Sequence, residues 1–415
     1  MDGRRAAVLV LAIGSVTAFG ENILYSLLSL YLKQNLGLSN VELGLFYLVL
    51  SLSSIVLRIP VGILADLFGR ARLVLAGLIL FLLGRAVLLF GERGLAYASA
   101  ALLGLGISMY YIPHAALTAD VSSADRRGGM LGMFGKLNFL AQVAGATGLV
   151  LGGYISQFFG RPAMIAASSI VIAVSAGLAA ILNRELPRSG GVEPRSILRE
   201  LVSSLRDRFL ALYLAANLAS GSFFASFVFL QVLLSVEYRL PDGVIGLILT
   251  LFTVVSAVSS YIAGRALSRR GRGELVAVQG VVWIGISLLS AASFVSTPLP
   301  ALLAFLTGLY ALLGVIYPVG SAVLYSYVSP RLRASVGNIG GMIWRAGHSV
   351  GSATVPHIVD ALGLRAFLVQ AAVASLLAFA ALRAAYRVYT QRLAAEQRCV
   401  AAVPRRGSGD GNRGG

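Results

Sequence analysis

The chain has 415 residues, of which 57% are hydrophobic and only 12% are charged, and its formal net charge is +17. Soluble domains carry about 25% charged residues. This composition, with a mean hydropathy of +0.83, therefore excludes a water-soluble globular protein and indicates a membrane protein. The single cysteine, Cys399, excludes an intrachain disulfide and gives no support to a thiol-bound metal.

Apolar segments of the length that a helix needs to cross a bilayer, about 20 residues, recur along the whole sequence. They predict an all-α integral membrane protein with two halves of six spans each. The first segment is too long for a signal-peptide core and has no small-residue cleavage site, so we expect it to remain as a span. The predicted spans are 8–32, 41–65, 73–91, 95–118, 129–155 and 163–183, followed by 209–234, 243–267, 275–295, 299–325, 335–359 and 365–386.

Basic residues cluster in alternate connections between the spans. With the N-terminus inside, cytoplasmic segments hold 25 of the 34 lysines and arginines. This bias predicts a protein of the cytoplasmic membrane with both termini in the cytoplasm. The charge thus follows the membrane rather than nucleic acid. We expect the lipid bilayer and a small-molecule substrate as partners, and a protein that functions as a monomer.

Residues 184–208 form the longest polar interruption and separate the predicted halves, 1–183 and 209–386. Apolar residues between 197 and 205 have the spacing of a short amphipathic helix on the membrane surface, although a plain linker fits equally well. Residues 387–415 form a basic tail, which we expect to be disordered.

A short charged turn lies between the second and third predicted spans. Its defining residues are Gly62, Asp66, Gly69, Arg70 and Arg72. A degenerate copy begins at Gly264, where Ser268 replaces the aspartate, and the segments 111–113 and 316–318 also match between the halves. The chain is therefore interpreted as a duplicated membrane protein.

This turn is similar to the signature of the major facilitator superfamily, which the chain resembles over residues 8–386. The resemblance implies twelve helices, a substrate cavity between two halves, and alternating access. It also implies a cytoplasmic gate in which Asp66 contacts the eleventh span and Arg70 contacts Asp120 at the end of the fourth. A pattern of charges that only sets the topology is the alternative explanation.

Glu21 is the one acidic residue that the sequence places near the centre of a span. An ionisable residue at that depth costs about 2.5–3.5 kcal/mol, so Glu21 must face protein or water. It could couple protons, form a permanent ion pair, or bind a cationic substrate. Lys136 on the fifth span and Arg345 with His348 on the eleventh are candidates to pair with Glu21 or to favour an anionic substrate.

Two further arginines lie within predicted spans. Arg85, on the third, is expected to snorkel outward because that helix is peripheral in the resembled fold. Arg58, near the cytoplasmic end of the second, is expected to support the gate.

Aromatic and amide residues recur at helical spacing on the helices that line the cavity by resemblance. These predicted cavity residues are Tyr25 on the first span, Tyr111 on the fourth, Asn217 on the seventh, and Tyr310 and Tyr317 on the tenth. Packing between helices is the alternative explanation.

The glycine-rich segment 145–153 of the fifth span is similar to a motif of drug/proton antiporters, with Leu149 in place of a proline and Ala100 in place of a fourth-span arginine. We therefore expect proton-coupled efflux of an amphipathic, drug-like compound. Uptake or exchange of a small polar or anionic solute is the alternative, and a non-transporting membrane sensor a remote one. The sequence predicts no catalytic residues, no metal site and no cofactor, with the proton gradient as the energy source.

Overall fold

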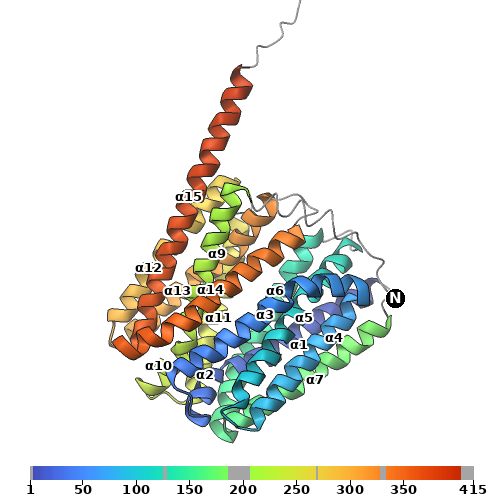
Figure 1. The fold of residues 1–415 in the computed structure, drawn as a ribbon, viewed down its shortest axis with the longest axis vertical. Coiled ribbons are helices and arrows are strands. Elements are labelled where there is room, and N and C mark those ends of the chain that lie inside the picture. Colours follow the sequence, from blue (N-terminus) through green and yellow to red (C-terminus); the bar gives the residue numbers. More distant parts are fainter. Residues whose placement is uncertain (1–2, 125–128, 186–205, 268–269, 328–332, 403–415) are drawn as a thin grey trace, which may run out of the picture.

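A computed structural model of the chain describes residues 3–124, 129–185, 206–267, 270–327 and 333–402. Every regular element in these ranges is a helix, and the long helices form one bundle (Figure 1). The predicted all-α fold is confirmed. The expected amphipathic segment 197–205 and Ser268 lie outside the described residues.

The helices that precede the linker include one that is broken into three pieces. They are α1 (Gly3–Tyr25), α2 (Leu28–Leu30), the π-helix η1 (Tyr31–Asn35), α3 (Asn40–Phe68), α4 (Arg70–Leu89), α5 (Leu95–Ala124), α6 (Gly129–Phe159) and α7 (Arg161–Glu185). We call these the N-terminal helices.

The helices that follow the linker repeat this pattern, again with a broken first member. They are α9 (Arg208–Ser226), η2 (Phe227–Phe229), α10 (Leu230–Val236), α11 (Asp242–Ala266), α12 (Arg272–Val295), α13 (Leu299–Tyr327), α14 (Arg333–Leu362), η3 (Leu364–Ala366) and α15 (Phe367–Ala402). We call these the C-terminal helices.

The structure provides enough long helices for the predicted spans. Within the described residues, 11 segments are long and apolar enough to cross a membrane. Helix α14 is not among them, although its 30 residues are sufficient in length. It contains Arg345 and His348, and polar residues at that depth indicate a helix that faces protein or a cavity rather than lipid.

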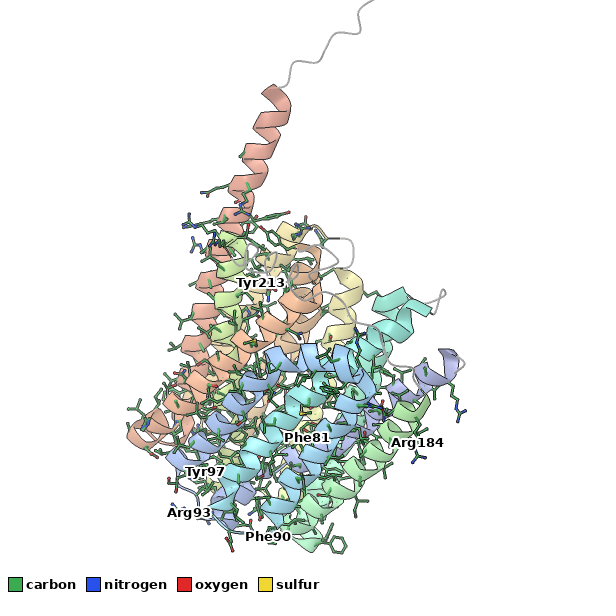
Figure 2. The ribbon with its side chains drawn as sticks, turned by 45° about the vertical axis from the view of Figure 1, so that its right-hand side comes forward. Phe81, Phe90, Arg93, Tyr97, Arg184 and Tyr213 are labelled. Atoms are coloured by element: carbon green, nitrogen blue, oxygen red, sulfur yellow. The ribbon has the colours of Figure 1, made fainter. Side chains whose placement is uncertain are left out.

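Successive long helices alternate in direction, so the bundle has two ends. We call the end that holds Gly3 and Ala402 the termini end, and the other the far end. Figure 2 shows Phe90 and Arg93 at the far end, and Arg184 and Tyr213 nearer the termini end.

Apolar packing joins the two sets of helices at the far end. One large cluster contains Leu43 and Phe46 of α3 together with Val355 and Val359 of α14. Nearer the termini end, the clusters of described residues each belong to one set. One is built around Val61, Ala65 and Leu73, and another around Leu210, Leu214 and Val336. The described packing therefore closes the far end more tightly than the termini end.

The basic tail differs from the expectation. Helix α15 continues through residues 387–402, whereas we expected disorder from 387 onward; residues 403–415 lie outside the described part. This part of the tail is rich in alanine, arginine and glutamine, which have high helix propensity. Arg392 also holds it to α9 through an ion pair with Asp207, with 2.6 Å between the paired atoms.

Candidate functional site

Two broken helices bring backbone and polar side chains to the middle of the bundle. Helix α1 ends at Tyr25, and α9 ends at the equivalent position, Ser226. The amide of Gln231 donates a hydrogen bond to the carbonyl oxygen of Tyr25 over 2.7 Å. This bond joins the two breaks and satisfies a carbonyl that the interrupted helix leaves free.

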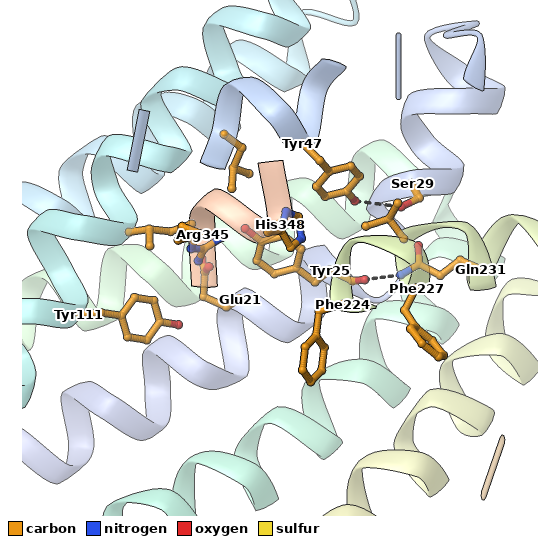
Figure 3. A pocket seen from close by; sticks show the side chains of 13 residues that line it. Glu21, Tyr25, Ser29, Tyr47, Tyr111, Phe224, Phe227, Gln231, Arg345 and His348 are labelled. Carbon is orange, nitrogen blue, oxygen red and sulfur yellow. Dashed lines mark hydrogen bonds between the residues drawn. The ribbon is translucent and has the colours of Figure 1, made fainter. Parts of the chain in front are cut away.

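A cavity of about 340 Å³ lies at this point, between the N-terminal and C-terminal helices. Figure 3 shows its side chains, which come from α1, α2, α3, α5, α9, η2, α10 and α14. Its lining residues are Glu21, Tyr25, Ser29, Tyr47, Leu50, Ile107, Tyr111, Phe224, Phe227, Val228, Gln231, Arg345 and His348. The walls thus combine aromatic surface with a few charged and polar groups, as small-molecule sites do.

Glu21 forms a buried ion pair with Arg85 of α4. The expectation that Arg85 snorkels outward is wrong, because its side chain is 0% exposed. Its Nε donates to Ser168 Oγ over 2.8 Å, and its Nη1 donates to the Phe81 carbonyl oxygen over 3.0 Å. Arg85 therefore links α1, α4 and α7, and among the described side chains it is Arg85, not Arg345, that forms the ion pair with Glu21.

Arg345 and His348 enter the cavity from the opposite wall. The guanidinium of Arg345 lies 5.2 Å from the ring centre of Trp344, a cation–π contact. His348 Nδ1 lies 3.0 Å from Ser51 Oγ of α3 and 3.2 Å from Ser352 Oγ. These hydroxyls hold the imidazole against α3, so His348 is a contact between the two sets of helices as well as a cavity residue.

Two buried polar atoms in the described part of the chain have no hydrogen-bond partner, Arg58 Nε and Gln231 Oε1. A buried polar group without a partner costs roughly 1–3 kcal/mol. Such atoms beside a cavity are candidates to bind a ligand. Gln231 lines the cavity, whereas Arg58, which sequence reasoning placed at the gate, lies against Gly341 of α14 outside the lining.

The remaining cavity predictions lie in different places. Asn217 packs near Gly340 of α14 and is not part of the lining. Tyr310 stacks on Phe252, with 4.7 Å between ring centres, so its ring contributes to helix packing outside the lining. The side chains of Lys136 and Tyr317 lie outside the described part.

The predicted gate is described only in part. Gly69 has a φ of +97° between α3 and α4, a backbone conformation that favours glycine. Arg70 donates to the Ala116 carbonyl oxygen of α5 over 3.5 Å, Gly62 has open space around it, and Arg72 is exposed. The side chains of Asp66 and Asp120 lie outside the described part, so the predicted contacts of these two carboxylates stay predictions.

A polar closure at the far end was missed by sequence reasoning. Asp242, at the start of α11, accepts hydrogen bonds from Arg161 Nη2 at 3.0 Å, Arg161 Nε at 3.1 Å and Ser156 Oγ at 2.5 Å. Asn40 of α3 also donates to Asp360 of α14 over 2.6 Å. These bonds connect N-terminal to C-terminal helices and close the cavity on that side.

Comparison with known proteins identifies the architecture. A profile described as the Major Facilitator Superfamily matches residues 10–241 and 212–400, which together span almost the whole chain. The chain belongs to the Major Facilitator Superfamily. It is a multi-pass membrane transporter rather than an enzyme.

Individual relatives are more distant. A multidrug resistance protein, MdtH of Aeromonas hydrophila subsp. hydrophila, is 26% identical over 341 residues, which cover 80% of this chain and 82% of that protein.

Two solved structures share the fold. A mutant of the nucleoside transporter NupG matches with a TM-score of 0.72 and 15% identity, covering 91% of this chain and 99% of that one. An auto-inhibited POT family peptide transporter matches with a TM-score of 0.69 and 14% identity, covering 94% and 97%.

Proposed function

We propose that this superfamily member is a secondary active transporter that exports an amphipathic, drug-like solute across the cytoplasmic membrane in exchange for protons. The observation that carries this proposal is the cavity between the two sets of helices, with aromatic walls and charged groups and a closed far end. The distant similarity to a multidrug resistance protein favours export over the alternative, uptake or exchange of a small polar or anionic solute.

The orientation follows from the basic residues. Arginines concentrate at the termini end, including Arg70 and Arg72, and the positive-inside rule assigns such an end to the cytoplasm. With this orientation, the structure represents a state closed to the outside. Transport then requires the far-end bonds to break while new contacts form around Asp66 and Arg70.

Proton coupling is assigned to Glu21. Its carboxylate belongs to the cavity wall and to the ion pair with Arg85, so solute and proton can both reach the same group. Protonation removes the negative charge that holds Arg85, which changes the contact between α1 and α4. This gives the proton a direct effect on the packing of the N-terminal helices.

The test is transport by purified protein in liposomes. An imposed pH gradient should drive accumulation of a labelled lipophilic dye, and addition of the dye should move protons in the opposite direction. Glu21→Gln should abolish the dye-driven proton movement while dye binding stays measurable. Undiminished proton movement by this variant would exclude Glu21 as the coupling residue, and no gradient-driven transport of any solute tested would refute the function.

A further inference from the structure

Helices α3 and α14 pack against each other as an antiparallel pair, one from each set. Asn40 lies opposite Asp360 at the far end, and Ser51 lies opposite His348 at the cavity. Further toward the termini end, Arg58 lies against Gly341, where a Cβ would collide with its guanidinium. The absence of a side chain at Gly341 therefore lets Arg58 rest on α14.

This register brings Arg58 close to Arg345. Gly341 and Arg345 are four positions apart in α14, so they occupy one face of the helix, one turn apart. Arg58, on Gly341, thus lies about one helical turn from Arg345, and the positive charge of Arg345 acts on it. Two guanidinium groups, one from each set of helices, therefore lie near each other: Arg345 lines the cavity, and Arg58 lies about one turn of α14 beyond it toward the termini end.

Neither arginine has an anionic partner in the described part of the chain. Arg58 Nε is buried without a hydrogen bond, and the guanidinium of Arg345 lies against the Trp344 ring, with the charge of Glu21 acting on it from across the cavity but no ion pair between them. Glu21, the acidic residue of the cavity wall, is already paired with Arg85. Buried cations without counterions are costly, and a bound anion would remove that cost.

We propose that Arg58 and Arg345 together bind the acidic group of an amphipathic organic anion. Guanidinium groups match the geometry of carboxylates and sulfonates through paired hydrogen bonds. The apolar part of the same molecule fits the aromatic wall formed by Tyr25, Phe224 and Phe227. This assignment specifies the substrate class of the proposed transporter. The claim that the anion is transported rests on the proposed function, whereas the claim that it binds does not.

The site also explains how binding reaches both sets of helices. Arg58 belongs to α3 and Arg345 to α14, so one acidic group contacts the two sets at once. The bound anion then acts as a bridge on the termini-end side of the cavity, where described apolar contacts between the sets are fewer than at the far end.

The experiment is equilibrium binding to purified protein by isothermal titration calorimetry. The probes are naphthaleneacetate, its neutral amide naphthaleneacetamide, and naphthylmethylammonium, which share one ring system and differ in charge. We expect the acid to bind at least about tenfold more tightly than the amide or the amine, because a charge-assisted hydrogen bond contributes more than a neutral one.

Variants assign the preference to the two arginines. Arg58→Gln and Arg345→Gln should each weaken acid binding by about tenfold or more and leave amide binding little changed. Arg58→Lys and Arg345→Lys keep the positive charge, so they should retain part of the preference for the acid over the amide. They replace the Gln variants in the test if the Gln variants fold poorly. Arg383→Gln, which removes an exposed arginine of α15, is the matched control and should bind the acid like the unaltered chain.

The outcomes separate this inference from the proposed function. Equal affinity for acid and amide, no binding of any acid, or an acid preference that survives both Gln substitutions would overturn the anion site. If the anion site is overturned in this way but the protein still transports a cation in response to a proton gradient, the proposed transporter function is unaffected. Acid-selective binding that depends on both arginines, without transport, would support the site and refute the function.

Discussion

Glu21 and Arg85 form a buried ion pair between α1 and α4, with exposed fractions of 5% and 0% for their side chains. Removing one partner of such a pair leaves an uncompensated buried charge. The arginine is further fixed by Ser168, whose hydroxyl donates to the Gly20 carbonyl oxygen over 2.7 Å. The pair is therefore part of the packing of the N-terminal helices as well as of the cavity wall.

Glu21→Gln is expected to lower the free energy of unfolding by about 3–5 kcal/mol, because Arg85 remains charged and buried. Replacing both residues with glutamine should recover part of this loss. The measurement is unfolding in mixed micelles titrated with SDS. Glu42→Gln, which breaks the more exposed pair with Arg93, is the control and should cost less than about 1 kcal/mol. A loss for Glu21→Gln no larger than this would contradict the structural role.

The sequence could predict the helices and the turn after the second span, for identifiable reasons. Apolar runs of membrane length mark spans whatever their partners are. Gly69 occupies a position with positive φ. This conformation depends on the local chain alone, so the glycine in the motif is enough to predict it. The predicted second span, 41–65, accordingly lies within α3, which ends at Phe68.

The partner of Glu21 could not be predicted, because pairing depends on how helices are arranged across the bundle. Arg85 was assigned to the lipid side from the position of its helix alone. Glu21 and Arg85 lie at similar distances along their helices from the termini end, counted from Arg5 and Arg70. This similar depth in the membrane was the one sequence feature that could have suggested Arg85 as the partner of Glu21.

The breaks in the first and seventh spans also escaped sequence reasoning. The residues at the breaks, Ser26 and Leu27 in one and Phe227 in the other, include neither proline nor glycine, which mark most interruptions. The far-end bonds of Asp242 likewise join residues distant in the sequence, so no local pattern shows them.

Asp242→Asn is expected to loosen the far end, because the amide cannot accept two hydrogen bonds from Arg161 as a carboxylate does. The measurement uses Ser29→Cys, a cavity position, in a Cys399→Ser background, with the labelling rate of a membrane-impermeant maleimide applied from the far-end side. Asp242→Asn should raise that rate severalfold. Glu42→Gln breaks a pair within the N-terminal helices and should not raise it. An unchanged rate with Asp242→Asn would argue against a closure by this contact.

Gly69→Ala is expected to destabilise the chain by roughly 1–2 kcal/mol, since alanine is strained at positive φ. Gly62→Ala is the matched control: it lies within α3, and a Cβ added there would have no atom of a neighbouring helix within 4 Å among the described residues, so alanine should be neutral or slightly stabilising there. Thermal unfolding of the two variants gives the comparison. If the Gly69 variant is as stable as the unaltered chain, the turn does not need glycine.

The contact of Asp207 with Arg392 predicts a dependence of stability on pH. Burial raises the pKa of Asp207, but hydrogen bonds from the Leu210 amide and the Arg392 side chain outweigh it, so that the pKa lies below its ordinary value of 3.8. A lowered pKa stabilises the folded state above that value, and this stabilisation is lost as the pH falls through the folded pKa. The unfolding temperature of Asp207→Asn should therefore lie below that of the unaltered chain near neutral pH, and the two temperatures should converge in acid. A difference that is independent of pH would contradict this assignment.

The most direct test of alternating access is a reversible cross-link across the far end. Gln34 Nε2 donates to Ser235 Oγ over 3.3 Å between the two sets of helices, so a reducible bismaleimide with a disulfide in its spacer can join Gln34→Cys to Ser235→Cys in the Cys399→Ser background. Glu42→Cys with Arg93→Cys joins N-terminal helices only, and is the control. We predict that cross-linking stops proton-driven transport in liposomes for the first pair, that reduction of the spacer restores it, and that the control pair transports throughout. Undiminished transport by the fully cross-linked first pair would contradict the account.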